Sequence, residues 1–187
     1  MAGDQVPGNF DERIAWLEED DAKSREWRAR RLEDLLEIVP VSSGGFHLFN
    51  GGDETMTCFH EVRRCYLDGS YMAVVLLALL YVERELAGLL YAAGWNPARN
   101  ARLGSLLDEA HDREVLSESD LQAFRELAKT RNSYAHFRPP GTPTSLMARS
   151  VERRDPPNEV IAQDARRALE AMWRLVQRSG GPFLSGG

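Results

Sequence analysis

The chain has 187 residues, which is enough for one domain with a substantial hydrophobic core and too few for two. Hydrophobic residues make up 43% and charged residues 28%, which are ordinary proportions for a soluble globular protein. The formal net charge of -6 argues against a protein that coats nucleic acid over much of its surface, since such proteins are normally basic.

The sequence carries no sign of export or membrane insertion. Met1 to Phe10 has no apolar core segment, and the longest uncharged apolar run, Tyr71 to Val82, is too short to span a bilayer. Cys58 and Cys65 lie seven residues apart in a predicted helix, so their Cα atoms would be roughly 10 Å apart, beyond disulfide reach. We expect buried thiols in a reducing compartment and a cytoplasmic protein without a membrane partner.

The first 52 residues predict a helical extension and a linker. Residues 1–9 contain helix breakers, whereas Phe10 to Val39 is dense in helix formers; its charged middle leaves open whether it forms one long helix or two. Trp16 and Trp27, eleven residues apart, are predicted to cover the chain's own core, the alternative being a stripe for a partner protein. Pro40 ends the helix, and the glycine-rich linker that follows, which contains His47, lacks the spacing of a phosphate-binding loop.

Residues 53–180 predict a helical domain, and residues 181–187 a loose tail. Asp53 or Thr55 is the expected cap of a helix that ends near Asp68, where Gly69 and Ser70 permit a break. The next helix, Tyr71 to Ala93, is the most apolar of the chain and is expected at the centre of a bundle or shared with a second subunit. Glu83 interrupts its buried face, unless it turns to solvent beside Arg84 and Glu85.

Three further segments complete the predicted helical bundle. Asn96-Pro97 is the expected start of a helix that reaches about His111. Ser117 or Ser119 is the expected cap of the next helix, whose inner face carries Leu121, Phe124, Leu127 and Ala128. Pro139 to Asn158 is predicted to be a proline-rich loop that contains Arg149, Arg153 and Arg154. Such a loop beside the motif could serve either as a lid or as an arm that binds the backbone of a ligand. Asn158 is the predicted cap of the last helix, and the fold class is all-α.

The chemistry concentrates in Lys129 to Pro140, which reads K-T-R-N-S-Y-A-H-F-R-P-P. If the segment is helical as far as His136, Asn132 and His136 lie one turn apart, with Arg131 beside them. An imidazole that exchanges protons near pH 7, a guanidinium that grips phosphate oxygens and an orienting amide together suit a phosphodiester. Taken singly, each residue is better explained as a helix cap or a surface residue. Arg125 to Arg154 has seven Lys and Arg against two Glu, which is either a local basic site or a solvated charged loop.

The motif R-N-x-x-x-H, closing a helix late in a small all-helical chain, resembles the signature of the HEPN superfamily (higher eukaryote and prokaryote nucleotide-binding domains). Arg131, Asn132 and His136 match it position by position. Glu61 to Leu86 is similar to the paired early helices of HEPN domains, where Glu83 matches an acidic residue that lies near the Arg and His in family members. The resemblance covers roughly residues 54–178. It implies an up-down helical bundle, and a homodimer in which two motifs face each other across one cleft.

Metal and cofactor chemistry are not expected. The four histidines, His47, His60, His111 and His136, form no H-x-x-x-H pair, the cysteines form no C-x-x-C pair, and no G-x-S-x-G elbow is present. Metal-free acid/base chemistry on RNA remains, with the 2′-hydroxyl as nucleophile. We expect His136 as the acid/base, Arg131 as the phosphate clamp, Asn132 as the orienting group, Glu83 in support, and Lys129 and Arg138 as substrate-binding cations.

Two alternatives to a nuclease remain. One is a non-catalytic HEPN-like nucleotide-binding or dimerisation module, and the other is an adaptor that binds a partner through the helix of Trp16 and Trp27. The resemblance also implies an antitoxin or defence-system protein as partner. Arg138 stands where some toxin-like relatives carry a tyrosine that an antitoxin modifies, so the sequence does not support that form of regulation.

Overall fold

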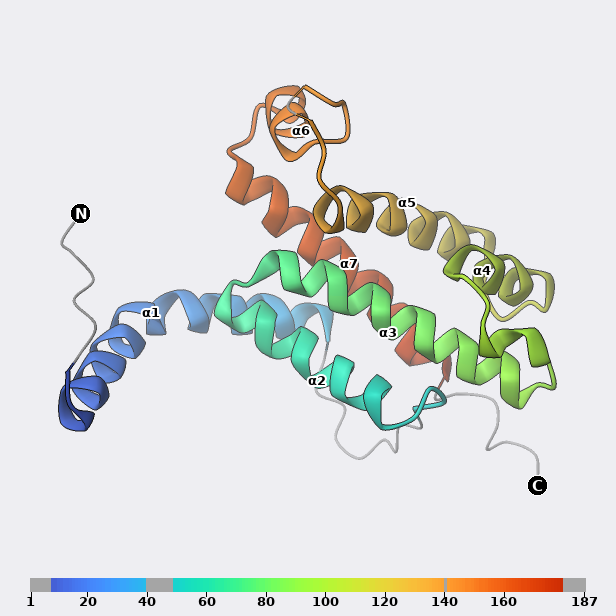
Figure 1. Cartoon of the computed structure of the whole chain (residues 1–187), viewed down its shortest axis with the longest axis horizontal. Helices are drawn as coiled ribbons and strands as arrows, with labels where there is room; N and C mark the ends of the chain where they lie inside the picture. Colours follow the sequence, from blue (N-terminus) through green and yellow to red (C-terminus); the bar gives the residue numbers. More distant parts are fainter. Residues whose placement is uncertain (1–7, 40–48, 140, 180–187) are drawn as a thin grey trace.

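The computed structural model describes residues 8–39, 49–139 and 141–179, and within these ranges the regular secondary structure is all helical, without a strand (Figure 1). The prediction of an all-α bundle is therefore confirmed. None of the described helices is long and apolar enough to cross a lipid bilayer. The elements in chain order are α1 (Phe10–Ile38), α2 (Asp53–Asp68), α3 (Tyr71–Ala92), the short 3-10 helix η1 (Asn96–Arg99), α4 (Leu103–Asp112), α5 (Glu118–Ala135), α6 (Leu146–Arg153) and α7 (Pro157–Ser179).

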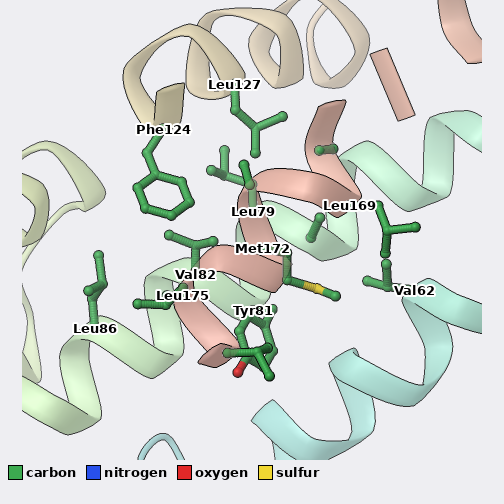
Figure 2. Close-up of a cluster of buried hydrophobic side chains, with 14 of the residues drawn as sticks. Val62, Leu79, Tyr81, Val82, Leu86, Phe124, Leu127, Leu169, Met172 and Leu175 are labelled. Atoms are coloured by element: carbon green, nitrogen blue, oxygen red, sulfur yellow. The ribbon is translucent and has the colours of Figure 1, made fainter. Parts of the chain in front are cut away.

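The helix α3 forms the centre of the bundle, as its apolar sequence predicts. It packs against α2, α4, α5 and α7, and its buried side chains meet those of α5 and α7 in one core (Figure 2). Burial of a Leu, Val or Phe side chain contributes roughly 1.5–3 kcal/mol, so this core is the main source of stability. Its central members include Leu79, Val82 and Leu86 of α3, Phe124 and Leu127 of α5, and Leu169, Met172 and Leu175 of α7.

The helix α1 is a single helix that projects beyond the bundle (Figure 1). Asn9 and Glu12 form a capping box at its start, whereas only Leu35 and Ile38 near its end are buried. Trp16 is 46% and Trp27 59% exposed, so the prediction that they cover the chain's own core is wrong. The reason is tertiary: Phe10 to Lys23 are all exposed beyond the bundle, and next to Trp27 the contact with α2 is made by Arg28, which lies 3.4 Å from Asp68.

The acidic residue buried in α3 is Glu85, whereas Glu83 is only half-buried. The carboxylate of Glu85 accepts hydrogen bonds from the backbone N–H of Asn50 at 2.9 Å and from its side-chain amide at 2.6 Å. Gly88 permits this approach, since a Cβ there would lie 2.1 Å from the Asn50 carbonyl oxygen. The alternative that Glu83 turns to solvent beside Arg84 and Glu85 is therefore wrong for Glu85, whose carboxylate anchors the segment before α2.

Several helix boundaries differ from the predicted ones. Neither Asp53 nor Thr55 caps α2, because its N-cap is Gly52 and Thr55 is fully buried. The segment from Asn96 divides into η1 and α4, and the predicted loop after Pro139 contains α6. The last helix begins at Pro157, before the predicted cap, since proline suits a first helical turn.

The remaining predictions about these segments have mixed outcomes. Gly69, with φ of 77°, ends α2 in the left-handed region as its position predicts. Cys58 is buried and Cys65 half-buried, and both are free thiols, as their spacing predicts. The predicted linker at His47 lies outside the described residues.

Candidate functional site

The start of α5 is firmly fixed, and this sets the register of the motif at its far end. Its N-cap is Ser117, one of the two predicted caps. The Ser117 hydroxyl accepts a hydrogen bond from the Asp120 backbone N–H. The buried Asp120 carboxylate lies 2.6 Å from the Arg178 guanidinium and 3.4 Å from that of Arg174, both on α7. With Phe124 in the core, the helix cannot rotate without losing both attachments.

The helix ends at Ala135, one residue before the histidine of the motif. His136 is the C-cap, with extended dihedrals of φ -125° and ψ 140°, and its side chain is exposed. Pro139 explains this end, because it has no N–H to donate to the Ala135 carbonyl and disfavours a helical Arg138. The premise that the helix reaches through His136 is therefore wrong, and the imidazole does not stand on a continuous helical face above Asn132.

Arg131 and Asn132 lie in a groove between α4 and α5 with a volume of about 400 Å³. Cationic side chains come from both helices, and no acidic side chain lines the groove. Leu103, Leu107 and Ala128 form an apolar floor. The residues that carry its polar character are Arg102 at the start of α4, and Gln122, Arg125, Lys129, Arg131 and Asn132 of α5.

Two of the four cations in this groove have protein partners and two do not. Arg125 pairs with Asp108 at 2.7 Å and Lys129 with Glu126 at 2.6 Å, both at exposed positions where such pairs contribute little. Within the described part of the chain, Arg102 and Arg131 make no ion pair, and the buried Nε–H of Arg131 has no acceptor. A buried donor without a partner is uncommon and costly, so this guanidinium is suited to an anionic ligand.

The other predicted site residues lie outside the groove. His136 and Arg138 are exposed beyond the end of α5, and Glu83 is half-buried on α3. None of these three has a hydrogen bond or ion pair with another described residue. The structure thus brings together Lys129, Arg131 and Asn132 and leaves His136, Arg138 and Glu83 apart from them.

A buried polar network next to the motif escaped sequence reasoning. The Tyr134 hydroxyl donates a hydrogen bond to Asp164 at 2.6 Å and accepts one from Arg149 at 2.9 Å. Asp164, with a side chain only 2% exposed, also forms ion pairs with Arg149 and, at 3.3 Å, with Arg153. Burial and the hydrogen bond to Asp164 both raise the pKa of Tyr134. The network joins the last turn of α5 to α6 and α7.

This network corrects the interpretation of the segment after Pro139 as an arginine-bearing arm. Arg149 and Arg153 turn inward to Asp164, and Arg154 alone of the three stays exposed. A signal for it is present in the sequence: Asp164 lies four residues after Val160 and four before Ala168, on the buried face of α7. An acidic residue on such a face requires buried cationic partners.

No group of three His, Cys, Asp or Glu side chains within the described ranges is close enough to hold a metal ion. In comparisons with known proteins, no family model matches the sequence, and no curated protein or solved structure is significantly similar to the chain.

Proposed function

We propose that this protein is a metal-independent RNA endonuclease of the HEPN type, with Arg131 as its phosphate clamp and His136 as its acid/base. The observation that carries the proposal is the groove between α4 and α5. Arg131 lies there without a protein acceptor, beside Asn132 and three further cations, with no acidic residue in the lining. Such a site suits the backbone of a single RNA strand, whose affinity for proteins comes largely from its phosphates.

Each motif residue has a defined part in the proposed reaction. His136 takes the proton from a ribose 2′-hydroxyl, whose oxygen attacks the adjacent phosphorus, and the bond from phosphorus to the 5′-oxygen breaks. The products are a 2′,3′-cyclic phosphate and a 5′-hydroxyl end. Arg131 stabilises the charge that develops on the non-bridging oxygens, and Asn132 orients the phosphate.

The leaving 5′-oxygen needs a proton from a second group. In the proposed homodimer this group is the His136 of a second copy, with the two motifs facing one cleft. The exposed position of His136 at the end of α5 leaves it free to meet such a copy. Lys129 and Arg138 would hold neighbouring phosphates. Glu83, which contacts none of these residues, would support the site only in the dimer.

The deciding experiment is incubation of the protein with end-labelled RNA in excess chelator. We expect cleavage with cyclic phosphate ends, and a loss of at least about a hundredfold in Arg131→Ala and in His136→Ala. His60→Ala and Arg64→Ala are matched controls, since both residues are exposed on α2 away from the groove. Cleavage that persists in His136→Ala, or that requires a divalent metal, would refute the proposed chemistry.

A second candidate is a non-catalytic nucleotide-binding or dimerisation module, and the state of His136 favours it. The imidazole has no hydrogen bond to any described residue, whereas a general base is normally oriented by one. For this candidate we expect no cleavage of any RNA, while Arg131→Ala weakens the binding of a fluorescent oligonucleotide and His136→Ala does not. An absence of cleavage and of oligonucleotide binding, in a protein that is also monomeric, would contradict both candidates.

A further inference from the structure

One face of α1 carries exposed apolar side chains at helical spacing over nearly the whole helix. Successive members are three or four residues apart, so they share one face. The five apolar members are 41–73% exposed, and the three charged members lie in the middle. We call this face the α1 stripe; it consists of Phe10, Ile14, Leu17, Asp21, Arg25, Arg28, Leu32 and Leu36.

Among the described residues, the α1 stripe forms an ion pair with the bundle only at Arg28, whose guanidinium lies 3.4 Å from Asp68 at the end of α2. The rest of the attachment comes from residues outside the stripe: Leu35 and Ile38 are buried, and Arg31 donates a hydrogen bond to the Leu67 carbonyl at 2.7 Å. Every residue from Phe10 to Lys23 is exposed. A helix segment of this kind has little stability alone, since most helical stability in proteins comes from packing of an apolar face.

The middle of the stripe already lines a groove of about 360 Å³. Asp21, Arg25 and Arg28 lie along it, and Leu67 at the end of α2 closes one side. Arg25 has no ion pair within the described ranges, and Asp21 has only a contact of 3.4 Å with Arg28. The groove therefore offers an apolar surface and charges that remain open to a further partner.

Charge is divided along α1 in a way that indicates its partner. Phe10 to Asp21 contains six acidic residues and one Arg, whereas Ala22 to Arg31 contains five Lys and Arg and one Glu. Two copies that run antiparallel place the acidic part of each against the basic part of the other, which a parallel pair does not. The surface is thus complementary to itself, as a two-fold interface requires.

We propose that the α1 stripe is a docking surface for the α1 of a second copy of this chain, packed antiparallel about a two-fold axis near Lys23. In this register Phe10 meets Leu36 and Ile14 meets Leu32, at both ends of the pair. Asp21 meets Arg25 twice, once on each side of the axis. The projecting end of each α1 then lies along the bundle-proximal end of the other, and this covers the segment that the bundle leaves bare (Figure 1).

The test is the mass of the full-length protein in solution, measured by light scattering during gel filtration. We expect Asp21→Arg to weaken association at least about tenfold, because it creates two like-charge contacts, and so to lower the mass towards that of the monomer at concentrations near the wild-type dissociation constant. Asp21→Arg combined with Arg25→Asp restores opposite charges at both contacts and is expected to restore the mass. Glu33→Arg, an equal charge change at an exposed position about 100° round the helix from Leu32, is the control and should leave the mass unchanged.

The proposal is overturned if the wild-type protein is a monomer at concentrations up to about 100 µM, at which a dimer with even micromolar affinity would form. A mass insensitive to Asp21→Arg, or not restored by the double exchange, overturns it equally. The inference is independent of the nuclease proposal, since the stripe shares no residue with the groove of Arg131. If the motifs also pair about a second, separate two-fold axis, the wild type is a larger assembly, and Asp21→Arg should reduce it to the motif-dependent dimer while RNA cleavage persists.

Discussion

Replacement of Asp164 is the most direct test of how the motif is held. The carboxylate is almost completely buried and is the common partner of Tyr134, Arg149 and Arg153. Asp164→Ala leaves two guanidinium groups and a phenol without their acceptor. Because Asp164 belongs to α7, the same change removes the polar attachments of α7 to the last turn of α5 and to α6, and leaves the hydrogen bond from Arg149 to Tyr134 as the link between α5 and α6.

The expected cost follows from the burial of the partners. Removal of one member of a buried ion pair typically costs 3–5 kcal/mol, since the other charge stays buried and unpaired. The Arg149 and Arg153 side chains are 13% and 28% exposed, so water reaches them in part and the lower end of that range applies. We expect Asp164→Ala to lower the free energy of unfolding by about 3 kcal/mol and the Tm by about 6–12 °C. Asp164→Asn keeps an acceptor for Tyr134 and should cost about half as much.

The assay is urea denaturation followed by far-UV circular dichroism, with Asp108→Asn as the control. Asp108 pairs with Arg125 at 2.7 Å but is 59% exposed, so its replacement should change the free energy of unfolding by no more than about 0.5 kcal/mol. A cost below about 1 kcal/mol for Asp164→Ala, or equal costs for the two aspartates, would show that the network does not hold the helices together.

Two further predictions concern the bundle itself. Gly88→Ala should lower the free energy of unfolding by at least about 2 kcal/mol, because the new Cβ would lie 2.1 Å from the Asn50 carbonyl oxygen. Gly104→Ala is the control: it has open space around its Cα and should be neutral or stabilising by about 0.5 kcal/mol. Equal effects of the two changes in urea denaturation would contradict the close approach of Gly88 to Asn50. Burial, chiefly, raises the pKa of Tyr66 to about 12. The unfolded chain therefore loses this proton first, and the stability that Tyr66 contributes below pH about 10 should be lost as the pH rises towards 12, by roughly 1.4 kcal/mol per pH unit. Tyr66→Phe should reduce the slope of stability against pH in this range, and an unchanged slope would exclude Tyr66 as a source of the alkaline loss.

Local patterns in the sequence were sufficient to predict the long helices and the centre of the bundle, but not α6 or the division into η1 and α4. Helix periodicity and capping act over a few residues, and for this reason the apolar run of α3, the cap at Ser117 and the break at Gly69 were predicted correctly. The end of α5 can also be predicted from the sequence, because Pro139 and Pro140 have no N–H groups for the hydrogen bonds of a further helical turn. The helix nevertheless ends one residue short of the length that the motif's spacing suggests, since His136 is the C-cap.

What the sequence by itself determined is the all-α class, the long helices and the residue types present at the end of α5. Only the tertiary structure decided which of them meet. Arg102 and Arg131 share a groove because α4 packs beside α5, and Asp164 reaches Tyr134 because α7 crosses that helix. Periodicity likewise predicts an apolar face on α1, but it does not show whether another surface covers that face. In the structure, the part of α1 from Phe10 to Lys23 extends beyond the bundle and is exposed. The physical reason is that helix formation depends on neighbours along the chain, whereas burial and ion pairing depend on neighbours in space.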